Sequence, residues 1–278
     1  MNAKFFLILI SFVLFQNLYS QEGQNAKKWE LVWNDEFNFF DTTIWKKLSN
    51  FDHYGEPAIY LDENVYTENG RLILAMKAQE YSCPEWMIEP NWSCVHQFKT
   101  GEPYKYTSGW VETKAEKDTK FGHIEARISF PYQKAFWPAF WTFQGTNEVN
   151  VNAAEIDIVE QLGEKGVNTL TTNIHTDYCT PDKESFSSGC PEIGDFFKSF
   201  STKKYDWTDW HVYGVDWDEK RIRFYLDGKK IRTIKKHGIV DPVKVILSFG
   251  LRPEIEVDDS LLPQNMQVDY VRVYKLKE

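Results

Sequence analysis

The chain has 278 residues, 42% of them hydrophobic and 16% aromatic, which is enough to bury one sizeable core. Its formal net charge of −9 argues against nucleic acid or an anionic membrane as a partner and, more weakly, against a highly sulfated polysaccharide. The 11 tryptophans suit both sugar stacking and the filling of a β-rich core, and we expect both uses at different positions.

Residues 1–20 predict a secretory signal peptide. Lys4 precedes an apolar run, residues 5–15, which is too short to span a membrane, and the small Ser20 marks the expected cleavage site. An uncleaved anchor is the alternative. We expect residues 21–278 to form one catalytic domain, secreted to the periplasm or the extracellular space as a monomer without membrane contact.

Short alternating segments rich in Val, Ile, Tyr, Phe and Trp predict strands, and they end at Gly, Asp or Pro. Hairpin turns are expected at Asp218 and Asp227, and residues 192–200 alone suggest a helical period. The sequence therefore predicts an all-β fold, a β-sandwich jelly roll of two antiparallel sheets whose terminal strands can pair. The predicted strands include residues 29–37, 71–78, 109–116, 122–130, 210–217, 221–228, 243–250 and 267–276.

Four cysteines form two local pairs. Cys83 lies near Cys94 and Cys179 near Cys190, which in an exported chain predicts two loop disulfides, one of three connectivities. Zinc binding is the alternative, although neither pair has the close spacing of a metal knuckle.

The segment FWPAFWTFQG predicts a strand with Trp137, Ala139 and Trp141 on one face. If neighbouring strands pair, this face can bind sugar rings beside acidic residues of the next strand. Core packing of the two tryptophans is the alternative. Pro138 implies an edge strand or a bulge.

The segment AAEIDIVEQLG sets three carboxylates among β-branched residues, which favour strands. Glu155 and Asp157 share one strand face, whereas Glu160 joins them only if one extra residue near Ile158 or Val159 forms a β-bulge. An amphipathic helix with a solvated acidic stripe is the alternative, and the β-branched run argues against it.

On a bulged strand Glu155 and Glu160 could approach to about 5–6 Å, close to the carboxyl spacing of a retaining glycosidase. Asp157 between them can share a proton, and such close like charges should raise at least one pKa, as a general acid requires. Paired acids also bind metals, but a metal site would more often recruit His or Cys, and the segment has neither. We expect no cofactor for catalysis.

The following segment, residues 169–178, places Asn173 and His175 on one face if it forms the next strand. His175 could hydrogen-bond the leaving-group oxygen or steady Glu160. A satisfied structural histidine is the alternative.

The motif EIDIVE resembles the E-x-D-x-x-E signature of glycoside hydrolase family 16 in its bulged-strand, laminarinase-like branch, which includes laminarinases, agarases, porphyranases and carrageenases. The resemblance covers almost all of residues 21–278. It implies a jelly roll with a concave substrate cleft. Further segments follow in family order: WELVWNDEF, DTTIWKK, NVYTENGRLIL, YTSGWVETK, FGHIEARISFP, FWPAFW, RIRFYLDG and VDYVRVY.

By that resemblance Glu155 is the nucleophile, Asp157 its assisting acid and Glu160 the general acid/base, the roles that the spacing also suggests.

The resemblance further implies a structural calcium on the convex side of the fold. Asp269 and Gly70 match the family's ligand positions, with Glu36 nearby, and oxygen ligands suit calcium. The alternative is that Asp269 is a plain strand-end acid.

Some positions depart from the laminarinase pattern. Val159 stands where Met is typical, NVNAA precedes Glu155 where Trp-Pro and Gly are usual, and SFGLRPE replaces a late Gly-Gly. These positions line the cleft in the family, so the resemblance implies the chemistry and leaves the substrate open. Arg252 could meet a sulfate or uronate, or form a surface salt bridge.

The sequence thus predicts a secreted, endo-acting, retaining β-glycosidase that hydrolyses a polysaccharide, with β-1,3- or mixed-linkage glucan favoured over an algal galactan of the agar, porphyran or carrageenan type. A transglycosylase is a second enzymatic reading. A non-catalytic sugar-binding jelly roll and a structural surface protein are non-enzymatic alternatives, and both have less use for three clustered acids.

We predict that the secreted protein starts near Gln21 and carries both local disulfides. Intact mass spectrometry measures the new N-terminus, and alkylation without reductant counts free thiols. Four alkylated cysteines would reject the disulfides, and retention of residues 1–20 would reject the cleavage.

Overall fold

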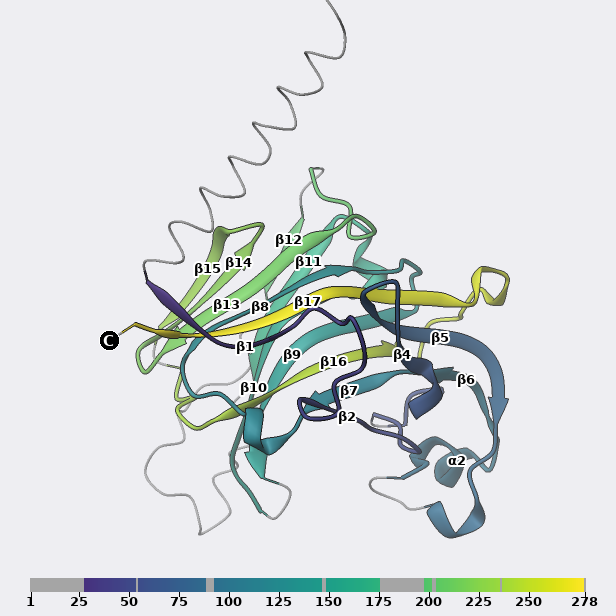
Figure 1. Cartoon of the computed structure of the whole chain (residues 1–278). Helices are drawn as coiled ribbons and strands as arrows, with labels where there is room; N and C mark the ends of the chain where they lie inside the picture. Colours follow the sequence, from purple (N-terminus) through teal and green to yellow (C-terminus); the bar gives the residue numbers. More distant parts are fainter. Residues whose placement is uncertain are drawn as a thin grey trace, which may run out of the picture.

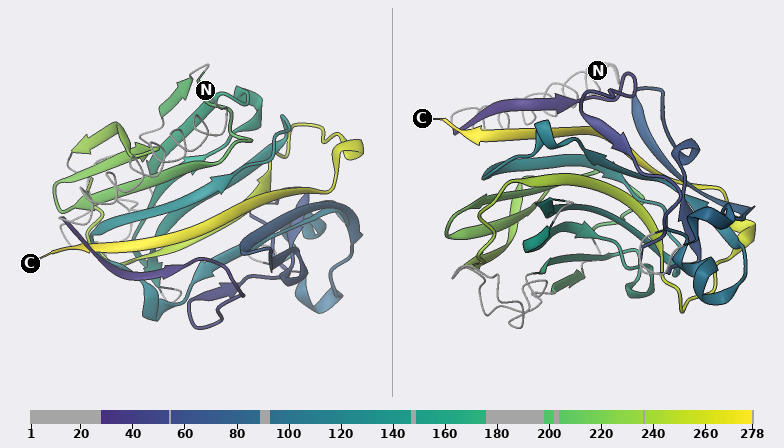
Figure 2. Two further views of the ribbon diagram at one scale, coloured as in Figure 1. Left: turned by 45° about the horizontal axis from the view of Figure 1, so that its top comes forward. Right: turned by 90° about the horizontal axis from the view of Figure 1, so that it is seen from below.

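The computed structural model describes residues 28–53, 55–88, 93–146, 149–175, 198–201, 204–235 and 237–277. It confirms a nearly all-β jelly roll in which two curved sheets lie face to face (Figure 1; Figure 2). In this part of the chain no helix is long and apolar enough to cross a bilayer.

The larger sheet has strands β15 (Lys229–Lys235), β14 (Arg221–Leu226), β13 (His211–Asp218), β8 (Gly122–Ser129), β17 (Gln264–Leu276), β5 (Arg71–Tyr81), β6 (Tyr104–Ser108) and β3 (Ala58–Tyr60), in that order. Strand β1 (Trp29–Asp35) also pairs with β17, and β4 (Val65–Glu68) with β5. The expected pairing of the terminal strands is therefore confirmed, with Trp29 opposite Leu276. The pair β3–β6 is parallel and the other described pairs are antiparallel.

The smaller sheet has the order β12 (Lys198–Ser201), β11 (Thr169–His175), β10 (Val149–Glu160), β9 (Phe136–Thr146), β16 (Val243–Leu251), β7 (Trp110–Thr113) and β2 (Trp45–Lys47). The short helical elements are α2 (Val95–Thr100), η1 (Asp62–Asn64), η2 (Glu85–Met87), η3 (Ala115–Lys117), η4 (Gly163–Lys165) and η5 (Asp259–Leu261).

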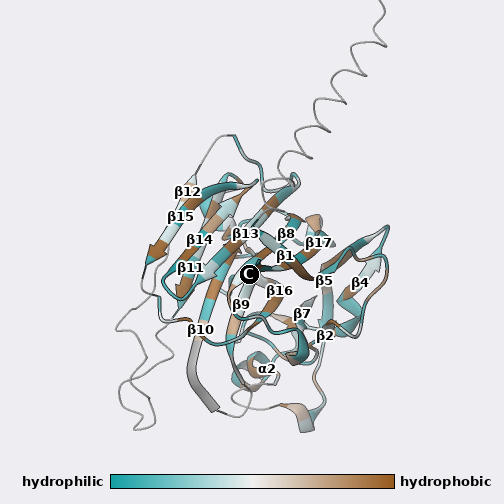
Figure 3. Cartoon of the chain, turned by 60° about the vertical axis from the view of Figure 1, so that its left-hand side comes forward, coloured by the Kyte–Doolittle hydropathy of each residue, from teal (hydrophilic) through white to brown (hydrophobic). Residues whose placement is uncertain are grey.

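The main core lies between the sheets because strand side chains alternate between faces. Leu72 and Val268 of the larger sheet and Phe140 and Leu247 of the smaller sheet are fully buried in one cluster. Figure 3 shows hydrophobic and hydrophilic residues interspersed along the strands of both sheets. The face of the smaller sheet that points away from this core is therefore available for a functional site.

Two local predictions were wrong. Residues 198–200, at the end of the suggested helix, lie in strand β12, and the rest of that stretch falls outside the described residues. Pro138 sits in a central strand, not at an edge. Its carbonyl accepts a hydrogen bond from Gln161, one residue past the end of β10, so the missing N–H of Pro138 faces a point where that ladder has ended.

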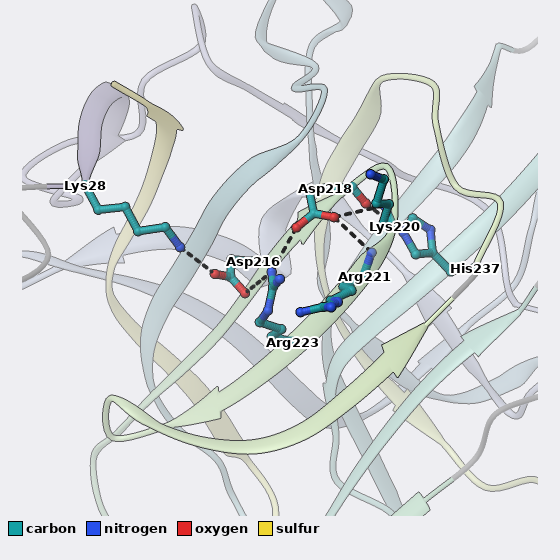
Figure 4. Close-up of polar contacts among 7 residues, drawn as sticks. All are labelled: Lys28, Asp216, Asp218, Lys220, Arg221, Arg223 and His237. Carbon is teal, nitrogen blue, oxygen red and sulfur yellow. Dashed lines mark hydrogen bonds and ion pairs between the residues drawn. The ribbon is translucent and has the colours of Figure 1, made fainter. Parts of the chain in front are cut away.

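The two expected hairpin turns are present. Asp227 and Gly228 both have positive φ, 49° and 71°, as a tight turn between strands β14 and β15 requires. At the other turn the Asp218 carboxylate accepts hydrogen bonds from the backbone N–H groups of Lys220 and Arg221, at 2.9 and 3.0 Å (Figure 4).

Charged side chains link this turn to Lys28, the residue before strand β1, on the outer face of the larger sheet. Arg223 lies between Asp218 and Asp216, at 3.1 and 3.6 Å, and Lys28 reaches Asp216 at 3.3 Å (Figure 4). His237 hydrogen-bonds the Asp218 carbonyl through Nε2 and accepts the Ile239 N–H at Nδ1, so it is held as the neutral Nε2–H tautomer.

The connection between the sheets near the N-terminus depends on a buried acid. Asp35, at the end of β1, accepts the backbone N–H of Phe37 at 2.8 Å and the indole N–H of Trp45 in β2 at 2.9 Å. Phe37 and Trp45 are both almost fully buried. The carboxylate therefore satisfies two donors that water cannot reach.

We predict that Asp35→Ala lowers the free energy of unfolding by about 2–4 kcal/mol, because two buried N–H groups lose their acceptor. Urea denaturation measures the change. Asp41→Ala is the control, since the Asp41 carboxylate is less buried and accepts its hydrogen bonds within a local turn, from the backbone and hydroxyl of Thr43. Equal losses in the two variants would contradict this role.

Candidate active site

A one-residue bulge in strand β10 shapes the site. Asp157 lies opposite Trp141 of β9, and Val159 lies opposite the very next partner, Phe140, so that Ile158 is the extra residue. The pairing of β10 with its other neighbour, β11, shows the same irregularity between Asp157 and Glu160. The predicted bulge is therefore confirmed, and it returns Glu160 to the side of Asp157.

The β-branched residues of the same segment anchor the strand. Ile156, Ile158 and Val159 are at most 2% exposed and belong to the main core. Burial of each such side chain contributes about 1.5–3 kcal/mol. The carboxylates of β10 therefore lie on a backbone that the core holds in place. We call the face of the smaller sheet that carries Glu155, Asp157 and Glu160 the acidic face.

Glu160 is buried and protonated at neutral pH. Its pKa is raised to about 8, first by burial and then by the negative charge of Asp157. The indole of Trp137 donates a 2.9 Å hydrogen bond to Glu160 Oε1, and with the positive charges of His175 and Arg252 it opposes part of that rise. A carboxylic acid that holds its proton at pH 7 suits a general acid.

A second group gathers Glu155, Asp157 and His175. His175 Nε2 lies 3.3 Å from Asp157 Oδ2 and 3.7 Å from Glu155 Oε1. The Asn173 amide is fixed by accepting the Ile174 N–H, which turns its Nδ2 toward His175 Nε2 at 3.0 Å. Asn173 and His175 therefore share the acidic face, as the sequence predicts, and His175 lies closer to the first two acids.

The same three groups have the chemistry of a cation site. One ligand atom from each of Glu155, Asp157 and His175 lies within 4.8 Å of the others. The histidine that the acidic segment lacks is thus supplied by the next strand. The three groups can also lie together without a cation, because a protonated imidazole neutralises part of the charge of the carboxylates.

Tryptophans flank the acids on the acidic face. Trp137 is partly exposed, whereas Trp141 is 7% exposed and packs edge-on against Trp110, with ring centroids 5.2 Å apart. The Trp141 indole donates to Ser248 Oγ at 3.1 Å. Both tryptophans occupy the predicted face, but Trp137 offers more surface for a sugar ring, and stacking by Trp141 stays a prediction.

Arg252 lies beside the general acid. Its guanidinium carbon is 5.3 Å from the centre of the Trp137 ring, and its Nε is 3.8 Å from Glu164. The salt bridge considered from the sequence is therefore present. Contact of Arg252 with substrate stays a prediction.

Sequence reasoning missed His53. Its ring centroid lies 5.7, 6.0 and 6.3 Å from those of Trp110, Trp137 and Trp141. Burial lowers its pKa to about 4 although Asp52 and Asp157 raise it, so the imidazole is neutral at pH 7. A single histidine between two short strands carries no periodic signal that could have identified it.

The two carboxylates predicted to bind calcium each have another partner. Asp269 pairs with Arg127 at 2.7 Å, and Glu36 pairs with Arg272 through both oxygens at 2.9 and 3.1 Å. Carboxylates already neutralised by guanidinium groups are a poor fit to a divalent cation. Gly70 has φ of 70°, which a turn explains without a ligand. Calcium binding stays a prediction.

The expected Cys83–Cys94 disulfide is present. It closes the segment that holds η2, and Cys94 directly precedes α2. Cys179 and Cys190 fall outside the described residues.

Comparison with known proteins agrees with this geometry. The sequence profile of glycosyl hydrolases family 16 matches residues 57–249. The chain is 28% identical over 271 residues to the clotting factor G alpha subunit of Tachypleus tridentatus, covering 89% of this chain and 34% of that one. It is 27% identical over 278 residues to glucan endo-1,3-beta-glucosidase A1 of Niallia circulans, covering 88% and 38%. The chain thus spans about a third of the length of these two relatives.

The solved structures agree as well. The laminarinase catalytic domain of Thermotoga maritima MSB8 superposes with a TM-score of 0.71 at 27% identity, covering 90% of this chain and 99% of that domain.

We predict that Trp137→Phe raises the pKa of Glu160, because the indole N–H stabilises the ionised carboxylate. Carbon-13 NMR of labelled glutamate side chains follows the titration, with Glu160→Gln identifying the signal. In the parent protein that signal should titrate near pH 8, and in Trp137→Phe at higher pH. A downward shift would contradict the assigned hydrogen bond.

Proposed function

The chain belongs to glycosyl hydrolase family 16, and from that premise we propose that it is an endo-acting, retaining β-glucanase. Its proposed substrate is a β-1,3-glucan or a mixed-linkage glucan, as for laminarinases. The observation that carries the proposal is the bulge at Ile158, which sets a protonated Glu160 on the same face as Glu155 and Asp157.

The two glutamates have different tasks in this mechanism. Glu155, ionised, attacks the anomeric carbon of the sugar while Glu160 gives its proton to the departing glycosidic oxygen. The bond to the leaving sugar breaks, and the glycosyl group stays joined to Glu155. Glu160, now ionised, then takes a proton from water, which attacks the same carbon and releases Glu155.

The surroundings of the acids support these different tasks. Burial and the charge of Asp157 keep the proton on Glu160. The imidazole of His175 lies 3.7 Å from the attacking carboxylate, where it can limit the repulsion between Glu155 and Asp157. Two carboxyl groups in unlike environments are the expected pattern for a nucleophile paired with an acid.

Glucan is favoured because the Niallia circulans relative and the superposed Thermotoga maritima domain carry glucanase and laminarinase names. A galactan substrate and a transglycosylase remain outcomes of the assay. A non-catalytic sugar-binding role is disfavoured, because such a protein would not need to hold a proton on Glu160.

We also propose that the protein is exported and acts as a monomer. The apolar run after Lys4 and the Cys83–Cys94 disulfide support export. Sedimentation of the purified protein tests the monomer.

The substrate assay uses laminarin, lichenan, agar, porphyran and carrageenan, read by reducing ends and by product size. We predict internal cleavage of laminarin or lichenan with net retention, so that proton NMR detects the β-anomer first. A chelator should leave the rate unchanged, since the mechanism needs no metal. An α-anomer as first product would contradict both the mechanism and the assignment of Glu155.

The variants separate the two glutamates. Glu160→Ala should lose on the order of a hundredfold or more with a poor leaving group, because general-acid help is gone. With an activated aryl β-glycoside and azide, this variant should give the β-glycosyl azide. Glu155→Ala should give only the α-azide, because azide then enters the empty place of the nucleophile.

A further inference from the structure

One loop brings a histidine to the acidic face from outside the smaller sheet. The loop comprises the described residues 51–53 and 55–56, between β2 and β3, and we call it the His53 loop. Its histidine is partly exposed and lies within 6.3 Å, centroid to centroid, of Trp110, Trp137 and Trp141. Trp137 also holds Glu160, so His53 lies one side chain away from the general acid.

Asp52 fixes the first part of the loop. This aspartate is 4% exposed, and its carboxylate accepts the backbone N–H groups of Gly55 and His96 at 2.6 and 2.7 Å and the hydroxyl of Tyr104. His96 belongs to helix α2, next to the disulfide, so the loop is tied to a cross-linked segment.

Glu56 fixes the other end. It is 2% exposed and accepts hydrogen bonds from Tyr60 at 2.5 Å, from the backbone of Leu251 at 2.6 Å and from the backbone of His53 at 3.3 Å. Leu251 ends strand β16, and the carboxylate lies so close to Gly250 that a Cβ there would meet it at 3.0 Å. The loop is therefore held at both ends, and His53 is placed before any ligand arrives.

The chemistry of the neighbouring side chains gives His53 a task. The indole N–H groups of Trp137 and Trp141 are already donated to Glu160 and Ser248. The indole faces can stack on the apolar faces of a sugar, but hydroxyl groups need hydrogen-bonding partners. An imidazole has two ring nitrogens, so it can hydrogen-bond a sugar hydroxyl through one of them while the other keeps a protein partner.

We propose that His53 is a specificity-determining residue, whose imidazole hydrogen-bonds a hydroxyl of the glucose unit that stacks on Trp137. The inference rests on the proposed glucanase function and names a residue that recognises its substrate. The bond forms in both the bound substrate and the transition state, so its loss raises KM and leaves kcat nearly unchanged.

The test compares three substitutions with laminarin and laminarihexaose as substrates. His53→Phe keeps a ring against the tryptophans and removes both nitrogens. His53→Ala removes the ring as well, and His53→Asn restores a donor and an acceptor. His96→Ala is the control, because its ring packs on Tyr104, 5.2 Å away, and the bond to Asp52 comes from its backbone.

We predict that KM rises about tenfold in both His53→Phe and His53→Ala, the size of one lost hydrogen bond. It should rise less in His53→Asn and stay unchanged in His96→Ala, with kcat within about threefold throughout. A normal KM in His53→Phe with a raised KM in His53→Ala would show that the ring only packs, and would overturn the proposal. Normal values in all variants would overturn it too.

A matched binding measurement separates this inference from the proposed function. Calorimetry with laminarihexaose in a Glu155→Gln background reports affinity without turnover. If the parent enzyme cleaves laminarin and the His53 variants bind as tightly as the parent, the inference alone is wrong. If the parent neither binds nor cleaves any of the glucans, the proposed function is wrong and the inference falls with it.

Discussion

The site depends on one inserted residue. Without Ile158 as a bulge against Phe140, strict alternation would turn Glu160 into the core, on the face of the sheet opposite to Asp157. The cost of the interrupted ladder is offset by the burial of Ile156, Ile158 and Val159. The same side chains that stabilise the sandwich therefore fix the spacing of the acids, which ties the activity to the integrity of the core.

Placing the acids in a nearly dry environment has an electrostatic consequence. Water would screen the charge of Asp157 from Glu160. Burial strengthens the repulsion between the two carboxylates and so favours the protonated form of Glu160. The flanking groups, among them Trp137 and His175, limit this effect, so Glu160 can still give up its proton in the first half of the reaction. The balance among these contacts sets how easily Glu160 gives and regains its proton.

The sequence was sufficient for the parts of the structure that follow local periodicity. Side chains alternate between the two faces of a strand, so Glu155 and Glu160 can share a face only with a bulge between them. The same two-residue repeat placed Trp137 on the face of the acids. His53, Asp52 and Glu56 could not be found in this way. Their roles depend on which strands and helices pack beside a loop, as when Glu56 meets Leu251, which is 195 residues away. The position of Pro138 was predicted wrongly for a related reason, because the point at which the neighbouring strand β10 ends cannot be read from the local sequence around Pro138.

The position of β17 has a consequence for biogenesis. Residues 264–276 form a strand that lies between β5 and β8 and also pairs with β1, so these earlier strands have no common neighbour until it is in place. Until this strand has been synthesised, the larger sheet cannot be completed, and long-range pairing of this kind is slow. The sandwich would therefore assemble late, after the C-terminal strand becomes available.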